Sequence, residues 1–177
     1  MACSYGVSIA TPPPSTTTTS APSQDPTAAR TAFGSFVRQY VTVRAEDRQA
    51  RNDTQSVLLQ EKGTTLEAAN KALVSWSFQK QMVSQRTGRR IGDLPRTVDT
   101  RIFIEAALEA NQLQQESDGI EFRVFALGGP QPSLGSQLVA LNIRIQRAWR
   151  LLDDKIEDSL RGYGLTWAEV GGRPQSD

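Results

Sequence analysis

The stretch SLGSQLVALNIRIQRAWRLLDDKIEDSLR, residues 133–161, carries the clearest structural signal in the chain. Apolar side chains recur in it at intervals of three and four residues, which is the spacing of one face of an α-helix. Arg144, Arg147 and Arg150 fall on or near its polar flank, and two glycines follow where the helix should end. We predict an amphipathic helix whose inward face is Leu134, Leu138, Leu141, Ile145, Ala148, Trp149, Leu152 and Ile156.

Upstream of this helix, the sequence predicts two others that begin at recognisable caps. The first starts at Asp25-Pro26, because aspartate caps helices well and proline suits the first helical position. The polar stretch 44–53 either continues this helix or forms a turn, and Gly63 is expected to end it. The second starts at Thr64 or Thr65, and the sequence RTGRRIGDLPR, residues 86–96, is expected to break it.

A third helix is predicted from about Val98 to Gln115. Residues 118–133 are expected to be irregular, and the alternating apolar residues within 120–125 are compatible with a short strand. Four helices joined by moderate loops indicate an all-α protein, a four-helix bundle with an extended N-terminal arm and an irregular C-terminal tail.

The domain boundaries follow from composition. Residues 1–25 form a Thr/Pro-rich arm, in which three prolines favour polyproline II and four threonines favour extended backbone. Residues 26–170 form the helical bundle, and residues 171–177 form a polar tail. The arm is either a disordered tail or a segment that becomes ordered against a neighbouring subunit.

The charge balance excludes nucleic-acid binding by bulk attraction. The chain has 20 basic and 19 acidic residues, a formal net charge of +1, whereas such binding calls for a strongly basic protein. Any nucleic-acid site must therefore be a local cluster. Arginine greatly outnumbers lysine, which suits planar contact with phosphate or carboxylate but is equally explained by a GC-rich coding sequence.

The absence of histidine and the single cysteine, Cys3, exclude several kinds of chemistry. They leave no internal disulfide, no metal site built on His or Cys, and no Ser–His or Cys–His nucleophile. No apolar run approaches the roughly 20 residues that cross a bilayer, and no secretory signal is visible. We therefore expect a non-enzymatic protein without cofactor, metal or membrane contact, made in a cytosol.

The sequence KIEDSLRGYGLTWAEVG, residues 155–171, resembles the C-terminal end of the coat proteins of rod-shaped plant RNA viruses of the tobamovirus-like type. In that family a long last helix is followed by an aromatic or apolar residue, Glu, a spacer, an apolar residue, one variable position and Trp. Here these positions are Ile156, Glu157, Leu165 and Trp167. The family usually has Phe in place of Ile156, and the spacer here is longer.

Weaker matches lie upstream, in the same order as in the family. Ser4 to Pro12 is similar to the tobamovirus-type N-terminus, and Asp25-Pro26 stands before the first helix as it does there. Gln49-Ala50-Arg51 and Asp99-Thr100-Arg101 match short family strings. The resemblance thus covers both ends of the chain and scattered points between them.

This resemblance implies a capsid subunit that self-assembles into a helical rod or disks and encapsidates single-stranded RNA. It implies many copies of the chain in a virion assembled in the host cytoplasm. Each subunit would be a four-helix bundle pointing radially, with both termini at the outer surface and the RNA in a groove at inner radius.

Sequence-independent RNA packaging requires arginine or lysine beside the phosphates. By the resemblance, Arg51 and Arg101 match family positions near the RNA. The family has a second arginine two residues further on, where this chain has Phe103. If the third helix corresponds to the third helix of the family, its far end approaches the RNA instead, and Arg123 and Arg144 are better placed. Both registers remain open.

The resemblance also draws attention to acidic residues. In the family, carboxylates that face one another across subunit contacts repel and drive disassembly, because close carboxylates raise one another's pKa. Candidates by location are Glu105, Glu109, Glu116 and Asp118, for which solvated helix positions are the alternative interpretation.

Two other functions fit a helical body with an arm. A phage structural protein, such as a head–tail adaptor or an internal virion protein, would form a closed ring and need no RNA. A helical adaptor module would not assemble at all.

Overall fold

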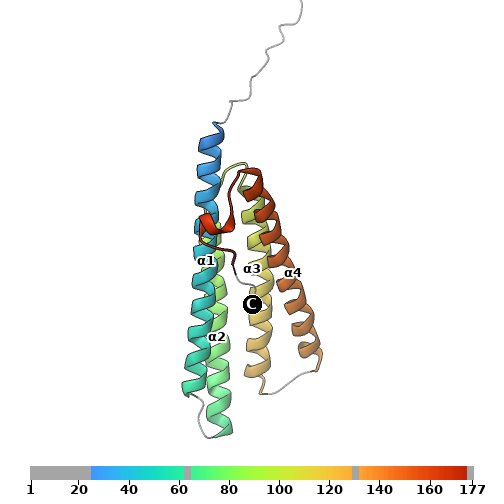
Figure 1. Cartoon of the computed structure of the whole chain (residues 1–177). Helices are drawn as coiled ribbons and strands as arrows, with labels where there is room; N and C mark the ends of the chain where they lie inside the picture. The colour runs from blue at the N-terminus through green and yellow to red at the C-terminus, as the bar shows by residue number, and fades with distance from the viewer. Residues whose placement is uncertain (1–24, 62–64, 129–131, 175–177) are drawn as a thin grey trace, which may run out of the picture.

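The computed structural model describes residues 25–61, 65–128 and 132–174. It contains four long helices, α1 (Pro26–Glu61), α2 (Leu66–Gly92), α3 (Arg101–Ala126) and α4 (Pro132–Gly162), followed by a short 3-10 helix, η1 (Trp167–Val170). No strand occurs among these residues, so the prediction of an all-α four-helix bundle is confirmed (Figure 1).

The helices run up and down, each antiparallel to the next (Figure 1). The start of α1, the α2–α3 connection and the end of α4 lie at one end of the bundle, which we call the tail end. The α1–α2 and α3–α4 connections lie at the opposite end, the far end. Contacts are extensive between α1 and α2, α2 and α3, and α3 and α4, but sparse between α1 and α4. The bundle is therefore open along the α1–α4 seam.

The core is built from the inward faces of all four helices. Its largest fully buried side chains include Phe33, Phe36 and Tyr40 of α1. On α4, the predicted inward residues Leu141, Ile145, Trp149, Leu152 and Ile156 are all buried, which confirms the helical spacing that predicted this element.

Two contacts close the half of the α1–α4 seam that lies toward the tail end. The Arg44 guanidinium lies over the Trp149 ring, 3.6 Å from its centroid, in a cation–π arrangement. The Tyr40 hydroxyl donates a hydrogen bond of 2.8 Å to the Asp153 carboxylate, and both side chains are buried.

Helix caps follow the sequence prediction at two sites. The Asp25 carboxylate accepts a hydrogen bond of 2.9 Å from the Thr27 backbone, so it caps α1 as expected. The Thr65 hydroxyl accepts one of 3.2 Å from the Ala68 backbone, so Thr65 caps α2. The stretch 44–53 continues α1. The predicted stop at Gly63 and residues 1–24 of the predicted arm lie outside the described residues.

The predicted break at 86–96 is wrong, because α2 continues to Gly92. The reason lies in the packing of α2 on α3 at Gly88. A Cβ atom at Gly88 would lie 2.6 Å from the Asn111 amide nitrogen, so glycine here permits close helix contact and does not end the helix. Only residues after Gly92 form the connection, and Ile91 and Leu94 are buried in the core.

The predicted irregular segment 118–133 and its short strand are also wrong over most of their length. Helix α3 begins at Arg101 and runs unbroken to Ala126. Asp118, where the irregular segment is expected to begin, is fully buried and neutralised by basic partners from α1 and α2. Ion pairing therefore allows a charged residue at an inward helix position.

Candidate nucleic-acid interface

The middle of the bundle holds a buried polar cluster around the Asp118 carboxylate of α3. Arg51 of α1 meets this carboxylate with both terminal nitrogens, Nη1 to Oδ1 at 3.3 Å and Nη2 to Oδ2 at 3.1 Å. The Ser84 hydroxyl of α2 also contacts Asp118 and Arg51. Three helices are thus joined at one fully buried carboxylate.

Further charges surround this cluster. Lys80 Nζ lies 3.7 Å from Asp118 and also pairs with Glu121. Asp47 accepts a hydrogen bond of 3.1 Å from Arg51 Nε and another of 2.6 Å from the Thr87 hydroxyl. The basic groups of the cluster are therefore compensated by carboxylates inside the same chain.

This arrangement defines the state of Arg51, one of the four predicted RNA contacts. Burial lowers the pKa of the guanidinium, but Asp118 and Asp47 outweigh this effect, and the pKa is raised above its usual value. Arg51 stays charged, and four of its five N–H donors already meet Asp47, Asp118 and Ser84. A phosphate in the groove that Arg51 lines would compete with these partners.

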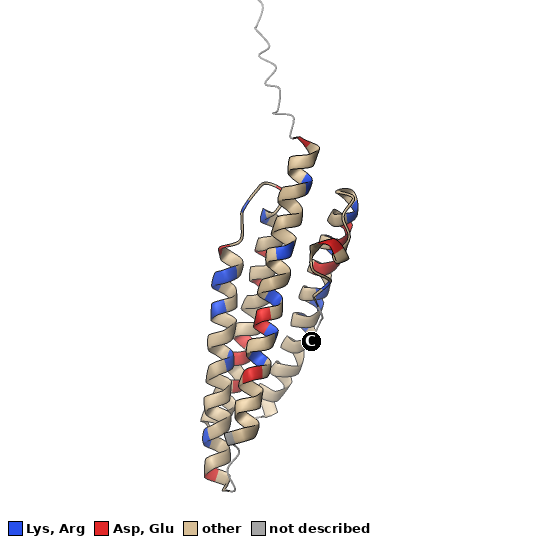
Figure 2. Ribbon diagram, turned by 60° about the vertical axis from the view of Figure 1, so that its left-hand side comes forward, with Lys and Arg blue, Asp and Glu red and all other residues tan. Residues whose placement is uncertain are grey.

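A polar groove of about 380 Å³ lies beside this cluster, in the half of the α1–α4 seam that lies toward the far end. Its walls present side-chain amides. Because amides both donate and accept hydrogen bonds, they can contact the polar groups of any base. The amides come from Asn52, Gln114, Asn142 and Gln146. Its charged lining residues are the basic Arg48, Arg51 and Lys80 and the acidic Glu121. Along the helices as a whole, basic and acidic residues are interspersed (Figure 2).

Arg101, the second predicted contact, starts α3 at the tail end of the bundle. Its side chain is exposed, and its Nε lies 2.7 Å from the Glu105 carboxylate one turn further on. This pairing raises the pKa of Arg101 through the hydrogen bond and charge of Glu105. Arg101 is therefore compensated and lies at the end opposite to the α3–α4 connection.

Arg123 and Arg144 differ from the first two arginines. Both are exposed, and neither forms an ion pair within the described part of the chain. Arg123 lies in the last turn of α3, at the far end, and Arg144 lies near mid-height on α4. Because their charge is not compensated, these two arginines are open to an external anion.

The residues that carry the tail motif meet at the tail end. Trp167 Nε1 donates a hydrogen bond of 3.4 Å to the Glu157 carboxylate, which also accepts one of 2.9 Å from Arg173. Ile156 is fully buried, and Leu165 packs so closely on α1 that a Cβ atom at Gly34 would lie 3.3 Å from it. The tail is therefore fastened over the α1–α4 seam.

The two carboxylates that contact the tail have lowered pKa values. A hydrogen bond from Arg161 lowers the pKa of Glu157, against the effect of burial, and the bond from Trp167 lowers it further. The pKa of Glu169 is lowered by hydrogen bonds from Thr166. Both carboxylates are thus held in the charged form that the tail contacts require.

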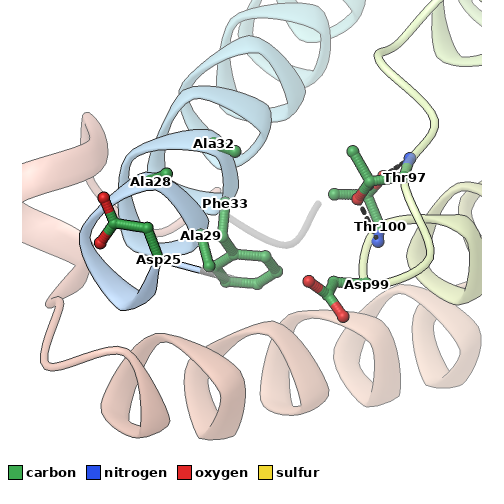
Figure 3. Close-up of a pocket in the computed structure, with 8 residues that line it drawn as sticks. All are labelled: Asp25, Ala28, Ala29, Ala32, Phe33, Thr97, Asp99 and Thr100. Atoms are coloured by element: carbon green, nitrogen blue, oxygen red, sulfur yellow. Dashed lines mark hydrogen bonds between the residues drawn. The ribbon is translucent and has the colours of Figure 1, made fainter. Parts of the chain in front are cut away.

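A second hollow, of about 260 Å³, lies between the start of α1 and the α2–α3 connection (Figure 3). Its charged side chains are the carboxylates of Asp25 and Asp99, and no basic residue lines it. Its other lining is formed by alanine, threonine and Phe33. The hollow is thus unsuited to phosphate.

The described residues contain no group of three or more His, Cys, Asp or Glu side chains arranged to hold a metal ion. Among them there is also no helix with the length and apolar character needed to cross a membrane.

Comparisons with known proteins give no match: no family model, no curated protein and no solved structure matches this chain.

Sequence reasoning missed the roles of Ser84 and Lys80 in the buried cluster. A signal existed, because Asp47 and Arg51 are one helical turn apart and Asp118 lies at an inward position of the extended α3 pattern. The early end predicted for the third helix hid this position.

Proposed function

We propose that this chain is a coat protein subunit that polymerises into a helical rod or disks around single-stranded RNA. RNA phosphates would be neutralised by a few placed arginines repeated in every copy. The near-neutral net charge of the chain suits this mode, because a polymer can supply many phosphate contacts although a single subunit supplies few.

The observation that supports this proposal is that the C-terminal tail is held to the bundle by the residues of the motif. The four residues on which the resemblance rests are not scattered in space. Ile156 is buried under the tail, Glu157 bonds to Trp167, and Leu165 packs against α1. A motif that holds the last segment of the chain to the bundle explains why these residue types recur together in a coat protein tail.

Within this proposal, Arg123 and Arg144 are the RNA contacts. They are the two of the four predicted arginines that pair with no carboxylate among the described residues, and Arg123 lies in the last turn of α3, at the end remote from the start of α1. This supports the register in which the far end of α3 approaches the RNA. Arg51 then serves the bundle interior, and Arg101 the outer end.

The experiment is reassembly of the purified full chain with and without a single-stranded RNA of defined length, followed by electron microscopy and nuclease treatment. The proposal expects rods or stacked disks, and RNA fragments protected from nuclease only when the protein is assembled.

The other functions give different results in the same experiment. A closed ring of fixed copy number without protected RNA would favour a phage structural protein. A monomer under every condition would favour a non-assembling adaptor. Either result would overturn the coat protein proposal.

A further inference from the structure

Two exposed surfaces of the chain are unpartnered and differ in charge. The first, which we call the α2–α3 surface, consists of Phe78, Met82, Glu109 and Glu116. Phe78 is 51% exposed and Met82 44% exposed, and Phe78 lies at the α2–α3 seam, where its ring centroid is 6.3 Å from that of Phe122. Within the described residues, neither glutamate forms an ion pair.

The second, which we call the α4 surface, consists of Val139, Ile143, Arg147 and Arg150. Val139 and Ile143 are each 63% exposed. Both arginines are exposed, and no carboxylate of the described chain pairs with them. Large apolar side chains flanked by arginine are typical of surfaces that become buried between proteins.

The charged residues of the two surfaces lie at similar heights along the bundle. Ser117 of α3 is level with Asn142 of α4, since their side-chain oxygens lie 3.3 Å apart. The two helices are antiparallel, so Glu109, eight residues before Ser117, is level with Arg150, eight residues after Asn142. Glu116 lies about 6 Å further toward the far end than Arg147, at about 1.5 Å of rise per residue.

The apolar residues match in the same way. Phe78 is level with Phe122, which lies five residues after Ser117 and is therefore level with position 137 of α4. Phe78 thus lies about two residues, or roughly 3 Å, closer to the far end than Val139 does. Met82 and Ile143 each follow one turn later on their own helices, so they have the same offset. On both surfaces the apolar pair therefore lies toward the far end and the charged pair toward the tail end.

We infer that the α2–α3 surface of one copy binds the α4 surface of a second copy, with the two bundles side by side and parallel. A shift of about 3 Å along the bundle axis brings Phe78 level with Val139 and Met82 level with Ile143. The same shift places the glutamates within reach of the arginines. If the second copy were antiparallel, the arginines of the α4 surface would lie opposite Phe78, and the glutamates of the α2–α3 surface would lie opposite Val139.

This contact joins two different surfaces, so each copy keeps one free surface of each kind and can bind a further copy. Repetition gives a ring if the rotation closes and a filament if it does not. All tails then lie at one end of the assembly and all far ends at the other. The inference rests on the self-assembly part of the proposed function and names the surface that performs it.

The test is charge reversal in the full chain, measured by sedimentation velocity without RNA. The double variants E109R/E116R and R147E/R150E each place like charges opposite one another, which disfavours the contact. We expect each to raise the concentration needed for assembly by at least about tenfold. An equimolar mixture of the two restores opposite charges at every contact and should restore assembly.

The matched control is D53R/E67R, which changes the net charge as much as E109R/E116R at two exposed positions outside both surfaces. It should assemble like the unaltered chain. Circular dichroism of each variant confirms that the bundle is folded before assembly is compared.

The outcomes separate this inference from the coat function. Assembly that survives both double variants, or a mixture of folded variants that stays unassembled, overturns the inference and leaves RNA packaging intact. Loss and rescue as expected, together with assemblies that never protect RNA, supports the inference and overturns the coat function. A chain that never assembles overturns both.

Discussion

Arg51 and Asp118, 67 residues apart in the sequence, form a two-point ion pair inside the bundle, with nitrogen–oxygen distances of 3.3 and 3.1 Å. Asp118 has no solvent exposure, and Lys80 lies 3.7 Å from it on the other side. Two basic groups from different helices therefore share this fully buried carboxylate, and each also pairs with a less buried one, Asp47 for Arg51 and Glu121 for Lys80.

Asp118→Asn should destabilise the protein strongly. The amide has nearly the shape of the carboxylate but removes the fully buried negative charge that Arg51 and Lys80 share, and breaking such a pair costs about 3–5 kcal/mol. Urea unfolding followed by circular dichroism measures the loss. Asp53→Asn, at an exposed position of α1, is the control and should change stability little. Equal stability of the two variants would show that the ion pair is dispensable.

Gly88→Ala and Gly135→Ala should have opposite effects, although both add a methyl group to a helix. At Gly88 the new Cβ atom would lie 2.6 Å from the amide nitrogen of Asn111, which donates a hydrogen bond of 3.1 Å to the Ser84 backbone carbonyl. Displacing this buried amide costs about 1–3 kcal/mol, more than the helix propensity gained.

At Gly135 nothing lies within 4 Å of the new atom, so only the gain of about 0.5–1 kcal/mol remains. Thermal unfolding should show a lowered Tm for the first variant and a raised Tm for the second. Stabilisation by Gly88→Ala would mean that α2 and α3 do not pack this closely.

Trp167→Ala tests whether the tail is fastened to the bundle. The indole is partly buried against the core and bonds to Glu157, so we expect a loss of about 2 kcal/mol, less than for a fully buried tryptophan. Trp167→Phe keeps most of the apolar contact and should lose about 1 kcal/mol. A free tail would tolerate both substitutions without any change in the free energy of unfolding.

Asp153→Asn should show a pH-dependent difference from the unaltered chain. Burial raises the pKa of Asp153, although the Tyr40 hydrogen bond and Arg44 lower it. A carboxyl whose pKa is higher in the folded state binds its proton more tightly there. Its contribution to stability is therefore lost as the pH rises from about 3.9 through the raised pKa.

The asparagine does not titrate and still accepts the Tyr40 hydrogen bond. Its free energy of unfolding relative to the unaltered chain should therefore improve between pH 3 and pH 7, which denaturant titrations across this range would measure. A difference that stays constant or declines with pH contradicts the cause assigned to the shift.

Arg123→Gln/Arg144→Gln tests the RNA contacts. The double variant removes two uncompensated charges from each copy, so we expect protected RNA to be lost above about 0.2 M salt while RNA-free assembly is unchanged. Arg101→Gln is the matched control, because Arg101 is also exposed but is paired with Glu105. If the control loses RNA and the double variant retains it, the opposite register is correct.

The sequence predicted the four-helix bundle and α4 almost to the residue, because the face from Leu134 to Ile156 follows the helical spacing without interruption. It also predicted the caps at Asp25 and Thr65, since capping depends on local residues alone. These features are determined by residues that are close together along the chain.

The predicted breaks at 86–96 and 118–133 failed for a different reason. Gly88 lies where the sequence predicts a helix break and Asp118 where it predicts an irregular segment, but each makes a contact with another helix that only the fold supplies. The ion pair between Arg51 and Asp118 likewise joins two helices that are distant in the sequence. Sequence alone does not show which arginines have internal carboxylate partners, and so it leaves two registers open, one with Arg51 and Arg101 and the other with Arg123 and Arg144.

A cryo-electron microscopy map of particles reassembled from the full chain and single-stranded RNA tests the central claim most directly. The account predicts a helical or stacked-disk particle with continuous RNA density beside Arg123 and Arg144, on the side remote from the start of α1. A closed ring without nucleic-acid density, or RNA density beside Arg101 at the tail end, would contradict it.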